Sequence, residues 1–332
     1  MRYPWQLSAS LAGYLLKQRL AGRRRYPIVL MLEPTELCNV ACEGCGRIRE
    51  YESTIKERLT VEECLQAVDE CGAPIVSICG GEPLLYRDIV PLVEGIVARR
   101  RHVYLCTNAI LLKRTLPKLK PSPYLSFSIH LDGLEATHDR ILNRKGTWRI
   151  AIEAIKAAKA AGFRVCTNTT IFKDTDPDEV IALLRYLKDL GVDGNLLSPA
   201  FEYTVLKGAG IFDTKEAIRE KFRRIAPHVG EFPLENTPLY LEFLEGKREY
   251  VCTPWGNVTF NPSGWKGPCY LITDAHYSSF AELMANTDWD RYEHRRDERC
   301  QNCLVHCSVE PTVIRQMRLA DLPALLRWQL SA

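Results

Sequence analysis

Short runs rich in Val, Ile, Phe and Tyr alternate with longer amphipathic stretches over the first two thirds of the chain. We expect six such runs to be strands, at residues 27–33, 74–79, 102–107, 124–131, 163–171 and 192–198. The stretches between them repeat apolar residues at helical spacing, at 60–71, 87–100, 110–119, 147–161 and 177–190. Several of the runs are too continuously apolar for a half-exposed sheet. The pattern therefore predicts parallel βα units with right-handed crossovers.

This alternation stops after about residue 200. Up to that point it fits an open doubly wound sheet as well as a closed or partial barrel. Further on, helical patterns interrupted by prolines give way to clustered cysteines, turn residues and a final helical stretch. We expect four segments: a basic amphipathic segment at 1–25, an α/β core at 26–200, a mainly helical connection at 201–250, and a cysteine-rich region with a terminal helix at 251–332.

The composition is that of an ordinary globular protein. The 332 residues are 46% apolar and 26% charged, and no apolar run approaches the roughly 18 residues that cross a bilayer. The net charge of +3 is uneven, because residues 1–25 carry six basic and no acidic side chains, which leaves −3 for the remainder. The main body is therefore not expected to bind nucleic acid.

Two apolar helical faces lie near the ends of the chain. The residues are Leu7, Leu11, Tyr14 and Leu15 in the first helix, and Leu319, Leu322, Leu326 and Trp328 in the last. The first face precedes a cluster of basic residues, a pattern typical of helices that lie on an anionic membrane surface. Either these helices contact the inner face of a membrane peripherally, or they cover the core of the protein.

The thirteen cysteines are an odd number and, at about 4% of the chain, too few for a disulfide scaffold. Charged residues interrupt the apolar part of the N-terminus, so it is not a convincing secretory signal. We therefore expect a cytoplasmic, reducing environment, in which clustered cysteines indicate metal or redox chemistry. Eight of the thirteen fall into two groups.

The first group follows the first expected strand and has the spacing C-x3-C-x2-C, with Cys38, Cys42 and Cys45. Loops at the carboxyl ends of parallel strands are where α/β folds place their chemistry. Three thiolates can hold three irons of a [4Fe–4S] cluster and leave the fourth iron open to an outside ligand. A zinc site is the alternative.

Together with Gly80-Gly81-Glu82-Pro83 after the second strand, this spacing resembles the radical S-adenosylmethionine (SAM) superfamily. The resemblance implies a partial (β/α)6 barrel, and a [4Fe–4S] cluster whose open iron chelates the amino and carboxylate groups of SAM. It also implies reductive cleavage of SAM to a 5′-deoxyadenosyl radical, with an electron donor such as flavodoxin or ferredoxin. Gly44 departs from the family pattern, which usually has an aromatic residue near the adenine at this position.

The same resemblance implies further contacts with SAM. Gly80 and Gly81 would let the backbone approach SAM closely, and Glu82 would accept a hydrogen bond from its ammonium group. Polar residues of the following strands would contact the ribose, carboxylate or adenine: Asn108, Ser128, His130, Asn168 and Ser198. The alternative for each of these five is a hydrogen-bonded polar group of the barrel core.

Longer stretches, among them VEGIVARRRHVYLCTNAILL, KPSPYLSFSIHLDGL and CTPWGN, resemble one subgroup, the adenosylhopane synthases of the HpnH type in hopanoid biosynthesis. This resemblance extends over about residues 10–310 and is weakest over 201–237. It implies a transferase of lipid metabolism that adds the 5′-deoxyadenosyl radical to the terminal alkene of diploptene. Cys79 stands where we expect proline in this subgroup.

Such an addition leaves a tertiary radical on the substrate, which then needs a hydrogen atom. Alternation along the third strand places Cys106 on the same face as Asn108, so both face SAM if either does. Because a thiol is a good hydrogen-atom donor to an alkyl radical, Cys106 is our candidate catalytic residue, with Cys79 in reserve. The alternative is that Cys106 is a small buried hydrophobic residue.

The second cysteine group lies beyond the barrel and comprises Cys252, Cys269, Cys300, Cys303 and Cys307. It resembles the SPASM/Twitch extensions that bind auxiliary iron–sulfur clusters. Four of the five suffice for one more [4Fe–4S] cluster, and a closed zinc site or no metal are the alternatives. Two other functions stay open: a SPASM-type enzyme that modifies a peptide or another apolar substrate by hydrogen abstraction, and an iron–sulfur or zinc protein that does not use SAM.

Overall fold

The computed structural model describes residues 3–331, so Arg2 of the basic segment lies outside it. Its centre is one nine-stranded sheet in the order β6-β5-β4-β3-β2-β1-β7-β8-β9. Strands β1 to β6 are parallel, β7 pairs in parallel with β1, and β8 and β9 are antiparallel. The strands are β1 Val29–Leu32, β2 Ile75–Ile78, β3 His102–Thr107, β4 Leu125–His130, β5 Arg164–Ile171, β6 Gly194–Pro199, β7 Asn257–Asn261, β8 Gly264–Pro268 and β9 Thr273–Tyr277.

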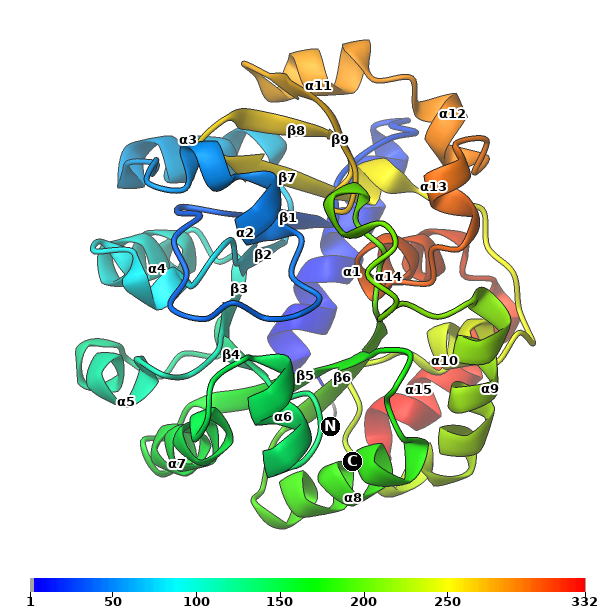
Figure 1. Ribbon diagram of the computed structural model, residues 1–332. Coiled ribbons are helices and arrows are strands. Elements are labelled where there is room, and N and C mark those ends of the chain that lie inside the picture. Colours follow the sequence, from blue (N-terminus) through cyan, green and yellow to red (C-terminus); the bar gives the residue numbers. More distant parts are fainter. Residues whose placement is uncertain (1–2, 332) are drawn as a thin grey trace.

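Helices surround the parallel strands on their outer side. Figure 1 shows α3 to α8 in an arc outside β1 to β6, with the yellow-to-red C-terminal segments on the open side of that arc. The helices are α1 Trp5–Leu20, α2 Arg47–Glu50, α3 Val61–Cys71, α4 Ile89–Ala98, α5 Leu112–Thr115, α6 Glu135–Ile141, α7 Thr147–Ala160, α8 Pro177–Asp189, α9 Lys215–Ile225, α10 Pro238–Leu244, α11 Phe280–Asn286, α12 Trp289–Glu293, α13 Glu298–Gln301, α14 His306–Gln316 and α15 Leu322–Leu330. The predicted α/β fold, a partial (β/α)6 barrel with a cysteine-rich C-terminal region, is confirmed.

The six predicted strands are all present, and their ends differ from the prediction by no more than two residues. The predicted helix at 110–119 is instead the short α5 followed by a 3-10 turn, Leu116–Lys118. Pro117 lies within that turn, and a proline ring clashes with the carbonyl of the residue four positions earlier in a continuous α-helix. The break therefore follows from a single residue inside an otherwise helical pattern.

Strands β7 to β9 were not predicted, since the segment after residue 250 showed mainly turn residues. In β7 the polar residues Asn257, Thr259 and Asn261 alternate with Val258 and Phe260. Although β7 is buried on both faces, three of its five residues are polar. Its composition therefore resembles that of a loop. Because β7 pairs with β1, the C-terminal region extends the barrel sheet. The division into four segments stays a prediction.

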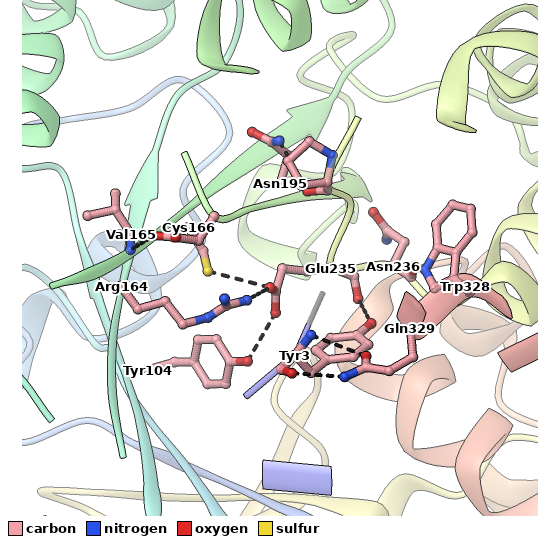
Figure 2. A network of polar contacts seen from close by, with 12 residues as sticks. Tyr3, Tyr104, Arg164, Val165, Cys166, Asn195, Glu235, Asn236, Trp328 and Gln329 are labelled. Carbon is pink, nitrogen blue, oxygen red and sulfur yellow. Dashed lines mark hydrogen bonds and ion pairs between the residues drawn. The ribbon is translucent and has the colours of Figure 1, made fainter. Parts of the chain in front are cut away.

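Polar contacts around Glu235 close the amino-terminal ends of the strands. The hydroxyl of Tyr104 in β3 donates to Glu235 Oε2 at 3.0 Å, and Arg164 of β5 forms an ion pair with Oε1. The Tyr3 hydroxyl donates to the Glu235 carbonyl, and Gln329 Nε2 of α15 donates to the Tyr3 carbonyl at 2.8 Å. Figure 2 shows these groups converging on Glu235. Both ends of the chain are therefore held at this end of the barrel, and the opposite end is free for chemistry.

The predicted membrane-facing side of α1 is wrong in its orientation. Leu7 is buried, while Leu11, Tyr14 and Leu15 are half-buried, so this face is turned toward the protein. The exposed apolar residues of α1 are instead Trp5, Leu16 and Leu20. At the other end of the chain, Leu319, Leu322 and Leu326 are exposed, whereas Trp328 is half-buried and donates to the Asn236 carbonyl at 3.0 Å. Within residues 3–331 no helix has the length and apolar character needed to span a bilayer.

Candidate active site

The three cysteines of the first group lie together in the loop between β1 and α2. Cys38, Cys42 and Cys45 are half-buried free thiols. Burial raises the pKa of Cys42, and the neighbouring thiols of Cys45 and Cys38 raise it further, which places all three within electrostatic reach of one another. Arg49 in α2 donates to the Cys42 carbonyl at 3.1 Å and to that of Cys45, and so fixes the turn of the loop.

The glycine motif after β2 packs directly against this cysteine loop. Gly80 has a φ of +109°, and a Cβ atom on Gly81 would lie 2.1 Å from the Leu37 carbonyl oxygen. The Gly81 amide donates to the Thr35 carbonyl at 3.1 Å, and the next amide along the chain donates to the Leu37 carbonyl at 2.7 Å. The glycines therefore make room for the cysteine loop, and the close approach to SAM expected of them stays a prediction.

The Glu82 carboxylate is held by neighbouring residues, and its expected contact with the SAM ammonium group stays a prediction. Its carboxylate is 1% exposed and accepts from Thr107 Oγ1 at 2.7 Å, from the Asn108 amide at 2.8 Å and from the Leu84 amide at 3.0 Å. Burial raises the pKa of Glu82, while these hydrogen bonds act in the opposite direction. Glu82 thus joins the end of β2 to the end of β3.

Asn108 holds the cysteine loop from the end of β3. Its Nδ2 donates to Asn39 Oδ1 at 2.7 Å, and its Oδ1 accepts from the Ile110 amide at 3.1 Å. Asn39 directly follows the first cysteine of the motif, so this contact fixes the position of Cys38. The sequence analysis missed Asn39, although its place beside Cys38 was a usable signal.

Cys106 lies on the inner face of the barrel between two serines. It is opposite Ser128 of β4, and its Sγ is 3.3 Å from Ser77 Oγ of β2. Burial raises the pKa of the Cys106 thiol, so it stays protonated at neutral pH. The predicted inward position of Cys106 is therefore what the structure shows, and Ser128 contacts this thiol.

His130 and Asn168 face each other across β4 and β5 in the next inward layer. His130 Nε2 lies 2.7 Å from Asp132 Oδ2, and this carboxylate raises the pKa of His130 against the effect of burial. Asn168 Oδ1 is buried and has no hydrogen-bond partner among the described residues. Asn168 thus has an acceptor left for a ligand.

Ser198 is used elsewhere than predicted. Its Oγ lies 2.8 Å from His306 Nδ1 in α14, the helix that carries Cys307. Burial lowers the pKa of His306 to about 4, so the ring is neutral and forms an ordinary hydrogen bond with this hydroxyl. Ser198 therefore joins β6 to the C-terminal cysteine region, and its expected contact with SAM stays a prediction.

Aromatic rings from distant segments fill the space beside the glycines of the cysteine loop. A Cβ atom on Gly44 would lie 2.3 Å from the Phe172 ring, and one on Gly46 would lie 2.3 Å from the Tyr203 ring. Phe172 directly follows β5. The aromatic group that is missing at position 44 is thus supplied by Phe172, a residue that the sequence analysis did not single out.

The second cysteine group surrounds a cavity on the C-terminal side of the barrel. This cavity is lined by Cys252, Cys269, Cys300 and Cys303, together with Phe201, Pro254, Leu271, Ile272, Tyr292, Arg295 and Ser308. Cys307 is 5% exposed and is not part of the lining. Within residues 3–331, no three His, Cys, Asp or Glu side chains converge on a point as a single metal ion requires. The four lining thiols therefore surround a cavity and do not meet at one point.

A buried charged cluster of Glu33, Glu36, Arg47 and Lys266 lies between the two cysteine groups. Each of these four side chains belongs to a residue no more than 3% exposed. Arg47 Nη1 is 3.7 Å from Glu33 Oε2, while both oxygens of Glu36 lack a hydrogen-bond partner among the described residues. Burial lowers the pKa of Lys266 to about 8, and the nearby Arg47 lowers it further. This cluster was not predicted from the sequence, because its members come from three separate segments.

Comparison with known proteins identifies the family. Residues 32–193 match the radical SAM superfamily, and residues 196–323 match a domain of unknown function, DUF3463. Residues 32–193, the barrel of this chain, thus belong to the radical SAM superfamily. Its [4Fe–4S] cluster and SAM are therefore the cofactor and co-substrate that the first cysteine group predicted. The donor set fits, since three neighbouring thiols are one ligand too few for a closed cluster.

The radical SAM relatives include GTP 3′,8-cyclases. That of Aquifex aeolicus is 31% identical over 172 residues, which are 49% of this chain and 54% of the relative. That of Clostridium perfringens is 25% identical over 256 residues, 72% of this chain and 79% of the relative. The chain thus spans about half the length of the first relative. These relatives do not support the narrower resemblance to adenosylhopane synthases, which stays a prediction.

Solved structures show the same fold at low identity. Streptococcus suis SuiB bound to the precursor peptide SuiA has a TM-score of 0.62 and 17% identity, and the match covers 92% of this chain and 71% of SuiB. The protein anSMEcpe with bound AdoMet has a TM-score of 0.60 and 14% identity, with 91% and 98% covered. The similarity extends over both the barrel and the C-terminal region of this chain.

Proposed function

We propose that this radical SAM enzyme cleaves SAM reductively at a cluster held by Cys38, Cys42 and Cys45. The observation that carries the proposal is the loop that presents three thiols together, with its backbone fixed by Gly81 and Asn108. When bound, the cluster and SAM supply a 5′-deoxyadenosyl radical. This chain's own residues position that chemistry at the carboxyl ends of the strands, above an inner barrel face that carries a protonated thiol.

We infer that the radical adds to a terminal alkene, with diploptene as the substrate to test, and that Cys106 then gives a hydrogen atom to the substrate radical. The long sequence stretches that resemble adenosylhopane synthases support the substrate. The thiol supports the second step, because it is protonated, lies inside the barrel and touches Ser77 and Ser128. Addition at the unsubstituted carbon of the alkene is favoured, because it leaves a tertiary radical on the substrate.

The test is anaerobic reconstitution with SAM, a one-electron reductant and diploptene, followed by mass spectrometry. We expect an adduct of diploptene and the 5′-deoxyadenosyl group from the native chain. Cys106→Ala should still cleave SAM but form at least tenfold less of the saturated adduct. The matched control is Cys64→Ala, a buried cysteine of α3 outside the barrel. Formation of 5′-deoxyadenosine without any adduct would exclude the alkene addition.

A second candidate is hydrogen abstraction from a polar substrate, whereas the alternative that the sequence left open was hydrogen abstraction from a peptide or another apolar substrate. The buried polar groups of Arg47, Lys266, Glu33 and Glu36 favour it, because buried polar groups without full partners are costly unless a polar ligand meets them. The relatives named GTP 3′,8-cyclase make GTP the first polar compound to test. Transfer of deuterium from labelled GTP or from a labelled peptide into 5′-deoxyadenosine would select this candidate.

We also propose that the cavity of the second group holds an auxiliary [4Fe–4S] cluster. Four thiols around one space are the donor set of a closed cluster. Iron and labile sulfide should then reach about eight of each per reconstituted chain, and about four if only the first site is filled. Four irons together with one zinc would favour the zinc alternative instead.

A further inference from the structure

Cys79 and Cys106 occupy neighbouring inward positions on adjacent strands. Ile78 of β2 is opposite Leu105 of β3, so the same register continued by one residue places Cys79 opposite Cys106. Side chains alternate along a strand, and Cys79 therefore shares the face of Ser77. That face meets Cys106, because Ser77 Oγ lies 3.3 Å from Cys106 Sγ.

Strand geometry continues through Cys79, since its amide donates to the Leu32 carbonyl of β1 at 2.8 Å. Paired strands lie about 4.8 Å apart, and disulfides join residues whose Cα atoms are roughly 4.4–6.8 Å apart. Two cysteines at opposite positions of paired strands therefore have a Cα spacing within the range of a disulfide. Both are free thiols in the structure.

A base lies beside this pair of thiols. Burial raises the pKa of Cys79, and the nearby Glu33 carboxylate and Cys106 raise it further. Glu33 is fully buried, and its Oε1 has no hydrogen-bond partner among residues 3–331. Cys79 therefore stays a thiol at rest, with an unoccupied carboxylate oxygen in its surroundings that can take the proton.

We propose that Cys79 and Cys106 form a redox pair, in which Cys79 is the resolving thiol for the sulfur radical left on Cys106. The inference rests on the proposed function, because Cys106 becomes a thiyl radical only after it has given a hydrogen atom to the substrate. Cys79 does not touch the substrate in this scheme. Its part is to convert the Cys106 radical into a closed-shell product.

The step balances as follows in atoms and electrons. The Cys106 thiyl sulfur bonds to the Cys79 sulfur, and the Cys79 proton passes to Glu33. The surplus electron of the resulting disulfide radical anion goes to a one-electron acceptor of the iron–sulfur class, which leaves a neutral disulfide. A dithiol reductant then donates two electrons and two protons and restores both thiols.

The first experiment tests the pair without turnover. The anaerobic, reconstituted protein is treated with diamide, digested, and searched for linked peptides by mass spectrometry. We expect a Cys79–Cys106 link in the native chain and none in Cys79→Ser. The matched control is Cys166→Ser. Cys166 is another inward cysteine, and its Sγ points to Glu235 in Figure 2. This variant should still form the Cys79–Cys106 link. Oxidation of both thiols to other products, without the link, would overturn the proposal.

The second experiment follows one turnover with SAM, reductant and diploptene in the absence of dithiol. The native chain should form about one disulfide per adduct. Cys79→Ser and Cys79→Ala, checked for native iron content, should form a first adduct and then a sulfur radical detectable by electron paramagnetic resonance. An adduct without a disulfide in the native chain would overturn the pair. If no adduct forms but diamide links the two cysteines, the alkene proposal fails and the pair stands.

Discussion

The two cysteine groups of this protein are built in opposite ways. The first has three thiols within residues 38–45, on one loop that follows one strand. The second draws its thiols from residues 252–307, out of the segments around β7, β8, α13 and α14. A spacing motif can specify the first group, since a short loop leaves few ways to place its thiols. The second group exists only once the sheet has brought those segments together.

The groups also differ in what holds them. Backbone hydrogen bonds from the glycine motif fix the first loop in a buried setting. Beside the second group, Arg299 forms ion pairs of 2.7 Å with Asp274 and 2.8 Å with Asp297, and Arg291 also pairs with Asp297. The arginines are partly exposed, and ion pairs of this kind contribute about 0–1 kcal/mol each and weaken with salt. The C-terminal group is thus the less firmly fixed of the two.

Removing one thiol of the first group should have the largest effect. Cys45→Ala leaves two thiols on the loop, too few to hold the cluster, so SAM cleavage should fall to background. The measurement is 5′-deoxyadenosine formed under anaerobic reduction, with Cys64→Ala as control. Cleavage at more than about a tenth of the native rate would contradict the assignment of this loop.

Removing a thiol of the second group should affect the second site and leave the chemistry of the first site intact. Cys269→Ser takes away a cavity-lining ligand, so iron should fall from about eight to about four per chain while SAM cleavage continues. Cys307→Ser is the matched control, because this thiol does not line the cavity and its loss should leave the iron content unchanged. Equal losses of iron in both variants would show that the ligand set is a different one.

The contact between Gly44 and Phe172 should be visible as an energetic coupling. Gly44→Ala forces its new methyl group against the Phe172 ring and should destabilise the protein by about 1–3 kcal/mol. Phe172→Ala removes the obstacle, so the double variant should lose less than the sum of the two single ones. Urea unfolding of all four proteins measures the coupling, and strict additivity would contradict the contact.

A histidine beside the first loop should produce the smallest effect, a dependence on pH. The buried His138 accepts from the Asp132 amide at 3.2 Å, and burial, aided by His130, lowers its pKa to about 4. Because the unfolded chain binds this proton near pH 6.5 and the folded chain only near pH 4, stability is lost as the pH falls through that window.

Between pH 7 and pH 5.5 the native chain should therefore lose about 1 kcal/mol more free energy of unfolding than His138→Gln. In this variant an amide oxygen can accept from the same Asp132 amide without a proton being taken up. Urea unfolding at the two pH values gives the difference. Identical losses in the two proteins would show that His138 is not responsible.

Much of the barrel and of its first site was predictable from residues close together in sequence. The six parallel strands follow from their apolar runs, and strand alternation placed Cys106 on the same face as Asn108. The capping box of α3 is another local feature, since Thr60 and Glu63 are three residues apart and hydrogen-bond to each other. Each of these relations depends on the period of a strand or a helix.

Partners that are distant in sequence could not be predicted in the same way. Glu82 accepts a hydrogen bond from Thr107, because β2 and β3 end side by side in the folded protein. Ser198 contacts His306, which lies 108 residues further along the chain. The residue types of Glu82 and Ser198 alone did not show that each forms a hydrogen bond with a residue from a distant segment.

The sequence by itself therefore determined the element order, the three-thiol loop and the side of each strand that faces inward. Only the tertiary structure decided that β7 extends the barrel sheet, that Phe172 stands in for an aromatic residue at Gly44, and that Cys79 lies opposite Cys106. The physical reason is range: backbone periodicity acts over a few residues, whereas strand pairing and close packing join segments that the chain order leaves far apart.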